Sequence, residues 1–317
     1  MALDHYVSQV HLRNFYSPDL GKRMYAIRKS DLKEFTPKSD DVCRIENGST
    51  NEYLEDERAV EEFLKGVEPN YNSALEKLRT NCLDAECIYA IAGFVAYIAT
   101  CSPTAMRIKS SPLKGVVEET SRILDAKGGF PPPPPELGGR GLTDLLEEGM
   151  IQVKIDPKYP QAIGIASILS HTSIFGNFKW EVLINSQEKN PFFTSDYPIA
   201  IEQTTDLRIH NKIMPLAPDI AIRICPNLDF DKKNVDFTFS DFSHKVRKPS
   251  RDEIMKINRL IVRCAEDTVF FRDNYPWVLN FVKRNAKYRI NPVTRKIPHG
   301  KGTVIWCIQE ISDASSD

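Results

Sequence analysis

The sequence predicts an α+β fold, with a helix-rich N-terminal half and a C-terminal half that mixes strands with helices. Two observations support this class. Apolar residues recur at helical spacing through most of residues 51–178, and short runs rich in β-branched and aromatic residues become frequent from Trp180 onward. Helices followed by a mixture of strands and helices, rather than a strict alternation, are the order expected of an α+β protein.

The N-terminal half is expected to open with short strands. Met24–Ile27 and Val42–Ile45 are runs of strand-forming residues, and pairing between them gives a short N-terminal strand pair. Before them, Ser8 can cap a short helix. Longer helices are then expected at 51–65, 69–79, 84–101, 112–126, 142–150 and 158–178.

The C-terminal half is expected to contain most of the strands. Ser250 and Glu253 can form a capping box for a helix at 250–264, and a second helix is expected at 275–284. We interpret residues 1–311 as a single composite domain, followed by a disordered polar tail at 312–317. The strands are expected at 180–184, 192–195, 213–216, 220–225, 268–271 and 303–311.

One Pro/Gly-rich insertion interrupts the domain at 130–141. It contains five consecutive prolines, 131–135, which favour polyproline II, and a Gly-Gly pair that gives a flexible joint. Such a run can be a ligand for the aromatic groove of a partner protein, or it can be an inserted surface loop. The sequence leaves both interpretations open.

Composition excludes several classes of protein. The net charge of −1 provides no global field that attracts nucleic acid, so binding of that kind needs a local patch. The seven cysteines include no Cys-x-x-Cys pair, which indicates reduced thiols and a cytoplasmic location. The apolar stretch 88–99 is shorter than the ~20 residues that cross a bilayer, and the N-terminus has no signal-peptide pattern. We therefore expect a soluble protein with no membrane partner.

The segment Pro191–Ile199 is the first candidate for a functional site. Phe192, Phe193 and Thr194 favour a strand that delivers Ser195 and Asp196 to its end. Short polar side chains at strand ends often bind ligands, but they also satisfy the backbone of ordinary turns. Local sequence is compatible with either role.

A series of short polar motifs runs along the whole chain. It starts with His5-Tyr6-Val7-Ser8-Gln9 and Leu12-Arg13-Asn14-Phe15, and continues with Val67-Glu68, Phe193–Ile199, Pro215–Pro218 and Asn258. In order and spacing this series resembles an uncharacterised, mostly prokaryotic family, the domain of unknown function 4238. Members of that family open with His-Tyr-Val-Pro-Gln and carry an aromatic-Ile-Thr-Ser-Asp-x-Pro motif. The resemblance implies a shared site that joins the N-terminal motif to residues 194–196, but no established activity.

The chain departs from that family at two helical positions. Many members carry Gln-x-x-Arg-Thr-Pro where this sequence has Ile98 and Cys101 in place of the Gln and the Arg. If those two side chains contact a substrate elsewhere in the family, this chain has lost or relocated the contact.

The candidate site combines acid–base groups with anion-binding groups. His5, Glu68 and Asp196 are the candidate catalytic residues, because imidazole and carboxylate groups exchange protons near neutral pH. An arginine can clamp a phosphate through two parallel hydrogen bonds, while amide and hydroxyl groups orient a substrate. The candidate substrate-binding residues are Gln9, Arg13, Asn14, Ser195 and Asn258.

Each of these residues also has a structural interpretation. Arg13 can simply pair with Glu68 or Asp196, and Asn258 can make a buried hydrogen bond. The other histidines, His11 among them, have no ligand-like spacing, so no structural metal is predicted. A catalytic Mg²⁺ ion held by Asp196 and Glu68 stays open, because carboxylate sites leave no tight sequence signature.

Basic residues gather between 283 and 301, interleaved with Phe281, Tyr288 and His299. Proteins that bind single-stranded nucleic acid use this mixture, although an ordinary solvated surface explains it too. We therefore expect a nucleic-acid-directed hydrolase, with RNA as substrate, of the RNase type found among prokaryotic defence and toxin effectors. The defence setting comes only from the type of family. The alternative is a non-catalytic module that binds an anionic ligand or a partner protein.

Overall fold

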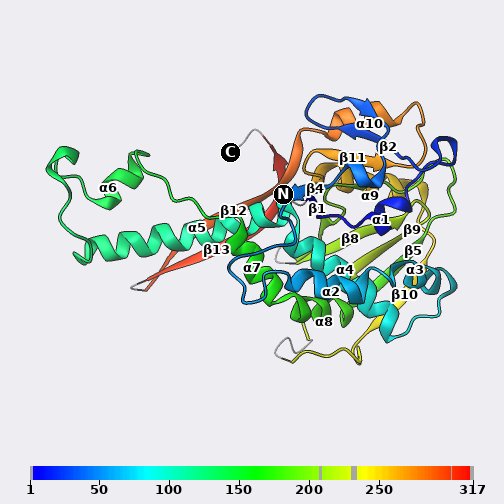
Figure 1. Cartoon of the computed structure of the whole chain (residues 1–317), viewed down its shortest axis with the longest axis horizontal. Coiled ribbons are helices and arrows are strands. Elements are labelled where there is room, and N and C mark those ends of the chain that lie inside the picture. The colour runs from blue at the N-terminus through cyan, green and yellow to red at the C-terminus, as the bar shows by residue number, and fades with distance from the viewer. Residues whose placement is uncertain (1–2, 207–208, 230–233, 301, 315–317) are drawn as a thin grey trace.

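The computed structural model of the protein describes residues 3–206, 209–229, 234–300 and 302–314. These residues form an α+β fold in which four sheets combine with helices. Most helices precede residue 177 and most strands follow it, so the predicted fold class is confirmed. A long arm projects from the main body (Figure 1).

The largest sheet carries the core of the body. Its five strands lie in the order β10 (Ser243–Arg247), β5 (Lys179–Ile184), β9 (Ile220–Cys225), β8 (His210–Ala217) and β7 (Ala200–Gln203). Figure 1 places α2 (Ala59–Val67), α4 (Ala85–Cys101) and α8 (Ile168–Gly176) on one side of this sheet and α9 (Arg251–Cys264) on the other.

The two faces of this sheet differ because alternate residues of a strand point to opposite sides. Trp180 of β5 is paired with Ile224 of β9, and both are buried. The neighbouring pair, Glu181 and Arg223, is charged. Arg223 is 7% exposed and also contacts Glu202 at 3.0 Å and Glu253 of α9 at 3.2 Å. The sheet is therefore joined to α9 by a shielded ion-pair network rather than by apolar packing alone.

A second sheet positions the Thr-Ser-Asp motif. Its strands lie in the order β3 (Glu34–Phe35), β2 (Tyr25–Arg28), β11 (Thr268–Phe271) and β6 (Thr194–Ser195). β11 pairs with both β2 and β6, and the amide of Asp196 donates a hydrogen bond to the carbonyl of Thr268 at 3.0 Å. Residues 194–196 are thus fixed against the C-terminal half of the chain.

Helix α4 is the centre of the helical layer. Asp84 caps its N-terminus by accepting a hydrogen bond from the amide of Cys87 at 2.9 Å. Gly93 lets α2 approach closely, because a Cβ atom there would lie 2.8 Å from the side chain of Val67.

Among the described residues no single helix is long and apolar enough to cross a membrane. Only a pair of helical stretches, Ala59–Thr80 and Ala85–Cys101, together meets the length and composition that a membrane span requires, and this pair is bent by 116°.

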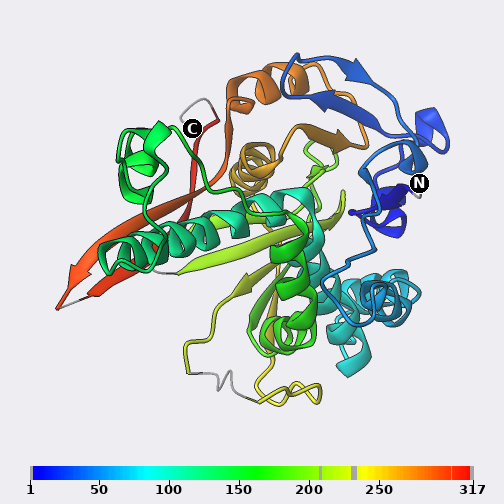
Figure 2. The same cartoon turned by 60° about the vertical axis from the view of Figure 1, so that its left-hand side comes forward.

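The arm consists of α5 (Pro103–Ala126), α6 (Leu142–Glu147) and a ribbon formed by β12 (Tyr288–His299) and β13 (Gly302–Asp313). α5 packs along one face of the ribbon, where the Ser111 and Thr294 hydroxyls lie 3.2 Å apart. Figure 2 shows α5 and the ribbon running side by side, away from the N-terminal segment.

The predicted pairing of the N-terminal strands was wrong. β2 pairs with β3 and β11, whereas β4 (Arg44–Glu46) pairs with β1 (Leu3–His5). A short N-terminal strand pair is therefore present, but its first member is a three-residue strand at the start of the chain. So short a strand has too few residues to show an alternating pattern.

Three predicted helices also have different bounds. The helix expected at 51–65 begins only at Ala59, as α2. The helix expected at 112–126 begins at Pro103, and Pro112 lies inside it. Pro103 suits the first turn, which needs no amide donor, and packing against the ribbon offsets the hydrogen bond lost at Pro112. The helix expected at 158–178 is divided at Ser167 into α7 (Lys158–Ala166) and α8.

The C-terminal region contains more strand than the sequence predicts. β7, β10 and β12 were missed, and β12 contains two prolines that argue against a central strand but are tolerated in a ribbon. The predicted tail begins too early, because β13 runs to Asp313 and the amide of Ala314 donates to the Lys287 carbonyl at 2.7 Å. Residues 315–317 of that tail lie outside the described residues.

The proline run is exposed and belongs to the arm. It leads into a single 3₁₀ turn, Pro135–Leu137, which Gly138 ends at a φ of 66°. We expect replacement of residues 131–139 by a Gly-Ser linker of equal length to change the melting temperature by no more than about 2 °C, because exposed substitutions cost little. Differential scanning calorimetry measures this change. A loss of several degrees would mean that the prolines pack as a structural element.

Candidate functional site

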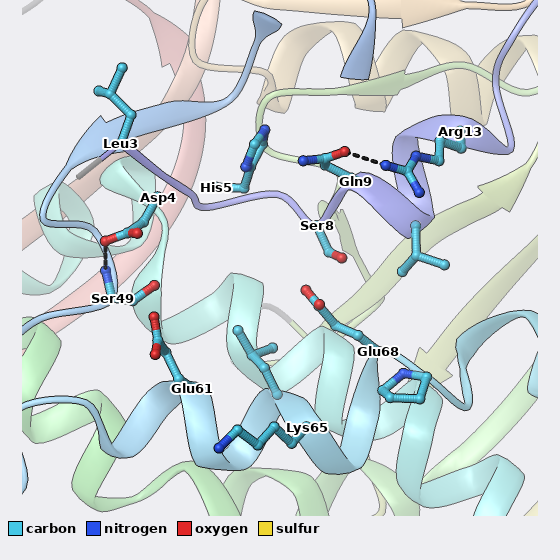
Figure 3. Close-up of a pocket in the computed structure, with 13 residues that line it drawn as sticks. Leu3, Asp4, His5, Ser8, Gln9, Arg13, Ser49, Glu61, Lys65 and Glu68 are labelled. Carbon is cyan, nitrogen blue, oxygen red and sulfur yellow. Dashed lines mark hydrogen bonds between the residues drawn. The ribbon is translucent and has the colours of Figure 1, made fainter. Parts of the chain in front are cut away.

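One open cavity of about 580 Å³ lies between the N-terminal motif and α2. β1 and α1 (Gln9–Arg13) form one wall and α2 forms the facing wall (Figure 3). Four of the predicted site residues line it: His5, Gln9, Arg13 and Glu68. The other four lie outside the lining: Asn14, Ser195, Asp196 and Asn258.

His5 is held with one ring nitrogen available. The Tyr97 hydroxyl donates to the His5 carbonyl at 2.6 Å, and Nε2 of His5 lies 3.2 Å from the Ser39 carbonyl oxygen. Since a carbonyl only accepts, the proton sits on Nε2 and Nδ1 remains an acceptor. Burial, assisted by the charge of Arg44, lowers the pKa of His5 below 6.5, so the imidazole is neutral at pH 7.

Gln9 and Arg13 lie one helical turn apart at the cavity. Nη2 of Arg13 donates to Oε1 of Gln9 at 2.5 Å, as expected for side chains four residues apart. The nearest carboxylate to Arg13 is that of Asp40 at 3.9 Å, and the expected ion pair with Glu68 or Asp196 is not seen within the described ranges. Asn14 instead donates to the Val10 carbonyl and to Asn72.

Glu68 is the carboxylate that the cavity leaves unengaged. It follows the last turn of α2 and points into the cavity (Figure 3). Asp4 accepts the amide of Ser49 at 3.0 Å, and Glu61 pairs with Arg58. The carboxylate of Glu68 has no hydrogen bond or ion pair in the part of the chain that the structure describes. Over the same residues, no group of three or more His, Cys, Asp or Glu side chains could hold a metal ion.

Asp196 lies outside the cavity and is engaged with the backbone. Its carboxylate accepts hydrogen bonds from three successive amides, those of Glu266 at 2.9 Å, Asp267 at 2.8 Å and Thr268 at 2.8 Å. Ser195 closes the adjacent turn, because its hydroxyl donates to the Tyr197 carbonyl at 2.7 Å. Both side chains therefore build the turn, which is the second of the two roles that their sequence allows.

Burial dominates the electrostatics of Asp196. It raises the pKa of this carboxyl to about 6, while the three amides and the charge of Lys29 act in the opposite direction. Lys29 is itself buried and donates to the carbonyls of Ala265 and Tyr288 at 2.5 and 2.7 Å. Asp196 and Lys29 thus hold in place the segment that leads into β11.

Asn258 also has a structural role. Its side-chain oxygen accepts the amide of Phe193 at 2.9 Å, and its nitrogen donates to the Pro191 carbonyl at 2.8 Å. The residue is fully buried. These bonds fix the strand that leads into residues 194–196, so Asn258 makes the buried hydrogen bonds that its apolar helix suggests.

His11 connects the two motifs, and sequence reasoning missed it. Its ring nitrogens lie 2.7 Å from the Tyr71 hydroxyl and 2.8 Å from the Thr194 hydroxyl. The N-terminal motif and residues 194–196 are therefore neighbours through His11, and not through His5 or Arg13. The sequence indicated a buried role for His11 through its position beside apolar Leu12, on the face of α1 opposite to Gln9 and Arg13.

The two departures from the family lie inside the core. Ile98 and Cys101 are buried in α4, and neither lines the cavity. The Cys101 thiol lies near Lys109, and burial lowers the pKa of Lys109 to about 8. Among the described residues, no side-chain hydrogen bond or ion pair connects either position to the site of His5.

The chain matches the family described as protein of unknown function (DUF4238) over residues 4–274. This match covers well over half of the 317 residues, so the chain belongs to that family, as the resemblance predicted. No curated protein and no solved structure matches the chain. The ribbon of β12 and β13 follows the matched region.

The geometry of Asp196 predicts a structural cost for its neutralisation. We expect Asp196→Asn to lower the free energy of unfolding by about 1–3 kcal/mol, because the amide nitrogen would face a backbone donor and leave it unsatisfied. Urea unfolding at pH 7 measures this difference. The matched control is Asp229→Asn, an exposed loop position where less than about 0.5 kcal/mol is expected. Equal unfolding midpoints for the two variants would contradict the structural role.

The burial of His11 predicts a dependence of stability on pH. Burial lowers its pKa from 6.5 to about 3, so the unfolded chain binds a proton more readily than the folded one. Stability is therefore complete above pH 6.5 and is lost as the pH falls toward 3, by no more than about 5 kcal/mol. Between pH 7.5 and 4.5, the unfolding free energy of wild type should fall more steeply than that of His11→Gln. Equal slopes for wild type and His11→Gln would refute the assignment.

Proposed function

We propose that this member of the DUF4238 family is a nucleic-acid-directed hydrolase that cleaves RNA in the cavity of His5, Arg13 and Glu68. One observation carries the proposal. A neutral imidazole, a guanidinium and an unengaged carboxylate, from two separate segments, line the same open cavity. A base, an anion clamp and a countercharge are the groups that phosphodiester cleavage uses.

In the proposed reaction the ribose 2′-oxygen attacks the adjacent phosphorus atom. Nδ1 of His5 takes the proton of the 2′-hydroxyl, and Arg13, oriented by Gln9, binds the phosphate oxygens. The charge of Glu68, which favours protonated His5, stabilises the imidazolium that forms. The bond from phosphorus to the 5′-oxygen breaks, and that oxygen takes a proton from a water molecule. The hydroxide left behind takes the proton of the His5 imidazolium, which restores the neutral base. The first products are a 2′,3′-cyclic phosphate and a 5′-hydroxyl, and addition of water to the cyclic ester then completes the hydrolysis to a 3′-phosphate.

The second candidate is a non-catalytic module that binds an anionic ligand or a partner protein. It is favoured by the burial of Asp196, whose three backbone hydrogen bonds remove one of the two expected carboxylates from the cavity. Arg13 and Gln9 would then hold an anion that is not cleaved. The Mg²⁺ ion between Asp196 and Glu68 that the sequence leaves open also loses support, because only Glu68 lines the cavity.

The test is cleavage of a labelled RNA pool in the presence of EDTA. Wild type should produce 2′,3′-cyclic phosphate ends, and RNA with 2′-O-methyl riboses should stay intact because it lacks the nucleophile. We expect His5→Gln to slow cleavage by about 100-fold or more, since it removes the base. Arg13→Gln should raise KM and lower the rate.

The matched controls are His244→Gln and Arg23→Gln, which change exposed residues away from the cavity. Both should cut as wild type does. Cleavage by His5→Gln at the wild-type rate would exclude the proposed base. If wild type binds RNA through Arg13 without cutting it, with or without Mg²⁺, the binding module is the correct function.

A further inference from the structure

The ribbon presents an outer face that α5 does not cover. Thr294 contacts Ser111 and approaches Gly115 of α5, so it marks the inner face. Adjacent residues of a strand point to opposite sides, and direct partners across a ribbon share a side. Arg295 and Ile297 therefore lie on the outer face with their partners Trp306 and Val304.

This outer face is apolar but open to solvent. Ile297, Val304 and Trp306 are 44%, 44% and 45% exposed. Trp306 stands directly opposite Arg295, which is also exposed. An aromatic ring beside a guanidinium provides a surface on which an unpaired base stacks while its phosphate is held.

The charge of the region is strongly one-sided. Residues 274–309 contain seven Lys and Arg residues and no Asp or Glu, although the whole chain has a net charge of −1. The first carboxylate of β13 is Glu310, and Asp313 further along pairs with Lys287 at 3.1 Å. β12 contributes Arg289, Arg295 and Lys296, and α10 (Val278–Asn285) contributes Lys283 and Arg284, so this positive charge is shared between the ribbon and the adjoining helix.

A second positively charged side chain, that of Lys212, lies where the ribbon meets the body. A cavity of about 430 Å³ is lined there by Ile308 of β13 and by His210 and Lys212 of β8, with no acidic residue in its lining. Ile308 follows Trp306 by two residues and shares its face. Within the described ranges the side chain of Lys212 forms no hydrogen bond or ion pair, and its ammonium group lies 5.9 Å from the centre of the Phe175 ring.

We propose that the outer face of the ribbon binds single-stranded nucleic acid, with Trp306 stacking on a base and Arg295 and Lys212 contacting phosphates. The inference rests on the proposed function and gives the ribbon the role of anchoring the substrate strand away from the cavity of His5. Charge complementarity favours this occupant over a second copy of the chain, which would bring equal positive charges together. An exposed ring also favours a single strand over a duplex, whose bases are already stacked.

The test measures binding with His5→Gln as the parent protein, so that no substrate is consumed. Fluorescence anisotropy with labelled oligouridylate and oligothymidylate of about 12 nucleotides gives the affinity. Trp306→Ala should weaken binding of both by about tenfold, whereas Trp306→Phe, which retains an aromatic ring, should keep most of it. Arg295→Gln should weaken binding and reduce the salt slope by about 1. The matched controls, Tyr159→Ala and Arg23→Gln, change exposed residues elsewhere and should bind as the parent does.

Three results would overturn the inference. They are equal affinity of Trp306→Ala and Tyr159→Ala, tighter binding of duplex than of single strand, and a dimer in light scattering that Trp306→Ala dissociates. The last would assign the face to a second copy of the chain. Binding that depends on Trp306, without any cleavage by wild type, would support the ribbon and refute the hydrolase. Cleavage by wild type with unchanged binding in Trp306→Ala would refute the ribbon alone.

Discussion

The hydrogen bonds of the buried His11 ring hold the two halves of the motif series together. One nitrogen contacts Tyr71 of α3 (Tyr71–Thr80) and the other contacts Thr194 of β6, which is 183 positions away in the chain. Phe15 and Phe94 surround the ring, with centroids 5.3 Å from it. Both nitrogens are satisfied in this apolar shell, so burial of the neutral imidazole costs little. An apolar replacement would leave two buried hydroxyls to find other partners.

The hydrogen bonds of His11 explain how the N-terminal motif can both pack in the core and line the cavity. On α1 the residues four apart share a face, so Gln9 and Arg13 reach the cavity while His11, Leu12 and Phe15 face the core. The Thr-Ser-Asp turn is used entirely for support, through the backbone amides that Asp196 accepts. The family signature therefore contains a buried half that positions α1 and an open half that lines the cavity.

Much of the fold could be predicted because its signals are local. The apolar run of α4 and the Ser250 cap of α9 depend only on nearby residues, and both helices lie close to where the sequence places them. The pairing of β1 with β4 could not be predicted, because each strand has only three residues and the two strands are distant from each other in the sequence. The role of Asp196 was equally hidden. A carboxylate at a strand end looks the same in sequence whether it faces a substrate or three amides, and the amides come from residues 266–268.

The antiparallel register of the arm has a consequence for how this protein can change over evolution. Pairing in the ribbon is continuous from Tyr288–Asp313 to His299–Gly302, without a bulge. Insertion of two residues into each strand near the tip would keep every side chain on its present face, because a strand repeats every two residues. Each such step would lengthen the ribbon by about 7 Å and leave the hydrogen bonds of His11 and the cavity untouched. The reach of the arm is thus a property that related chains can vary independently of the site.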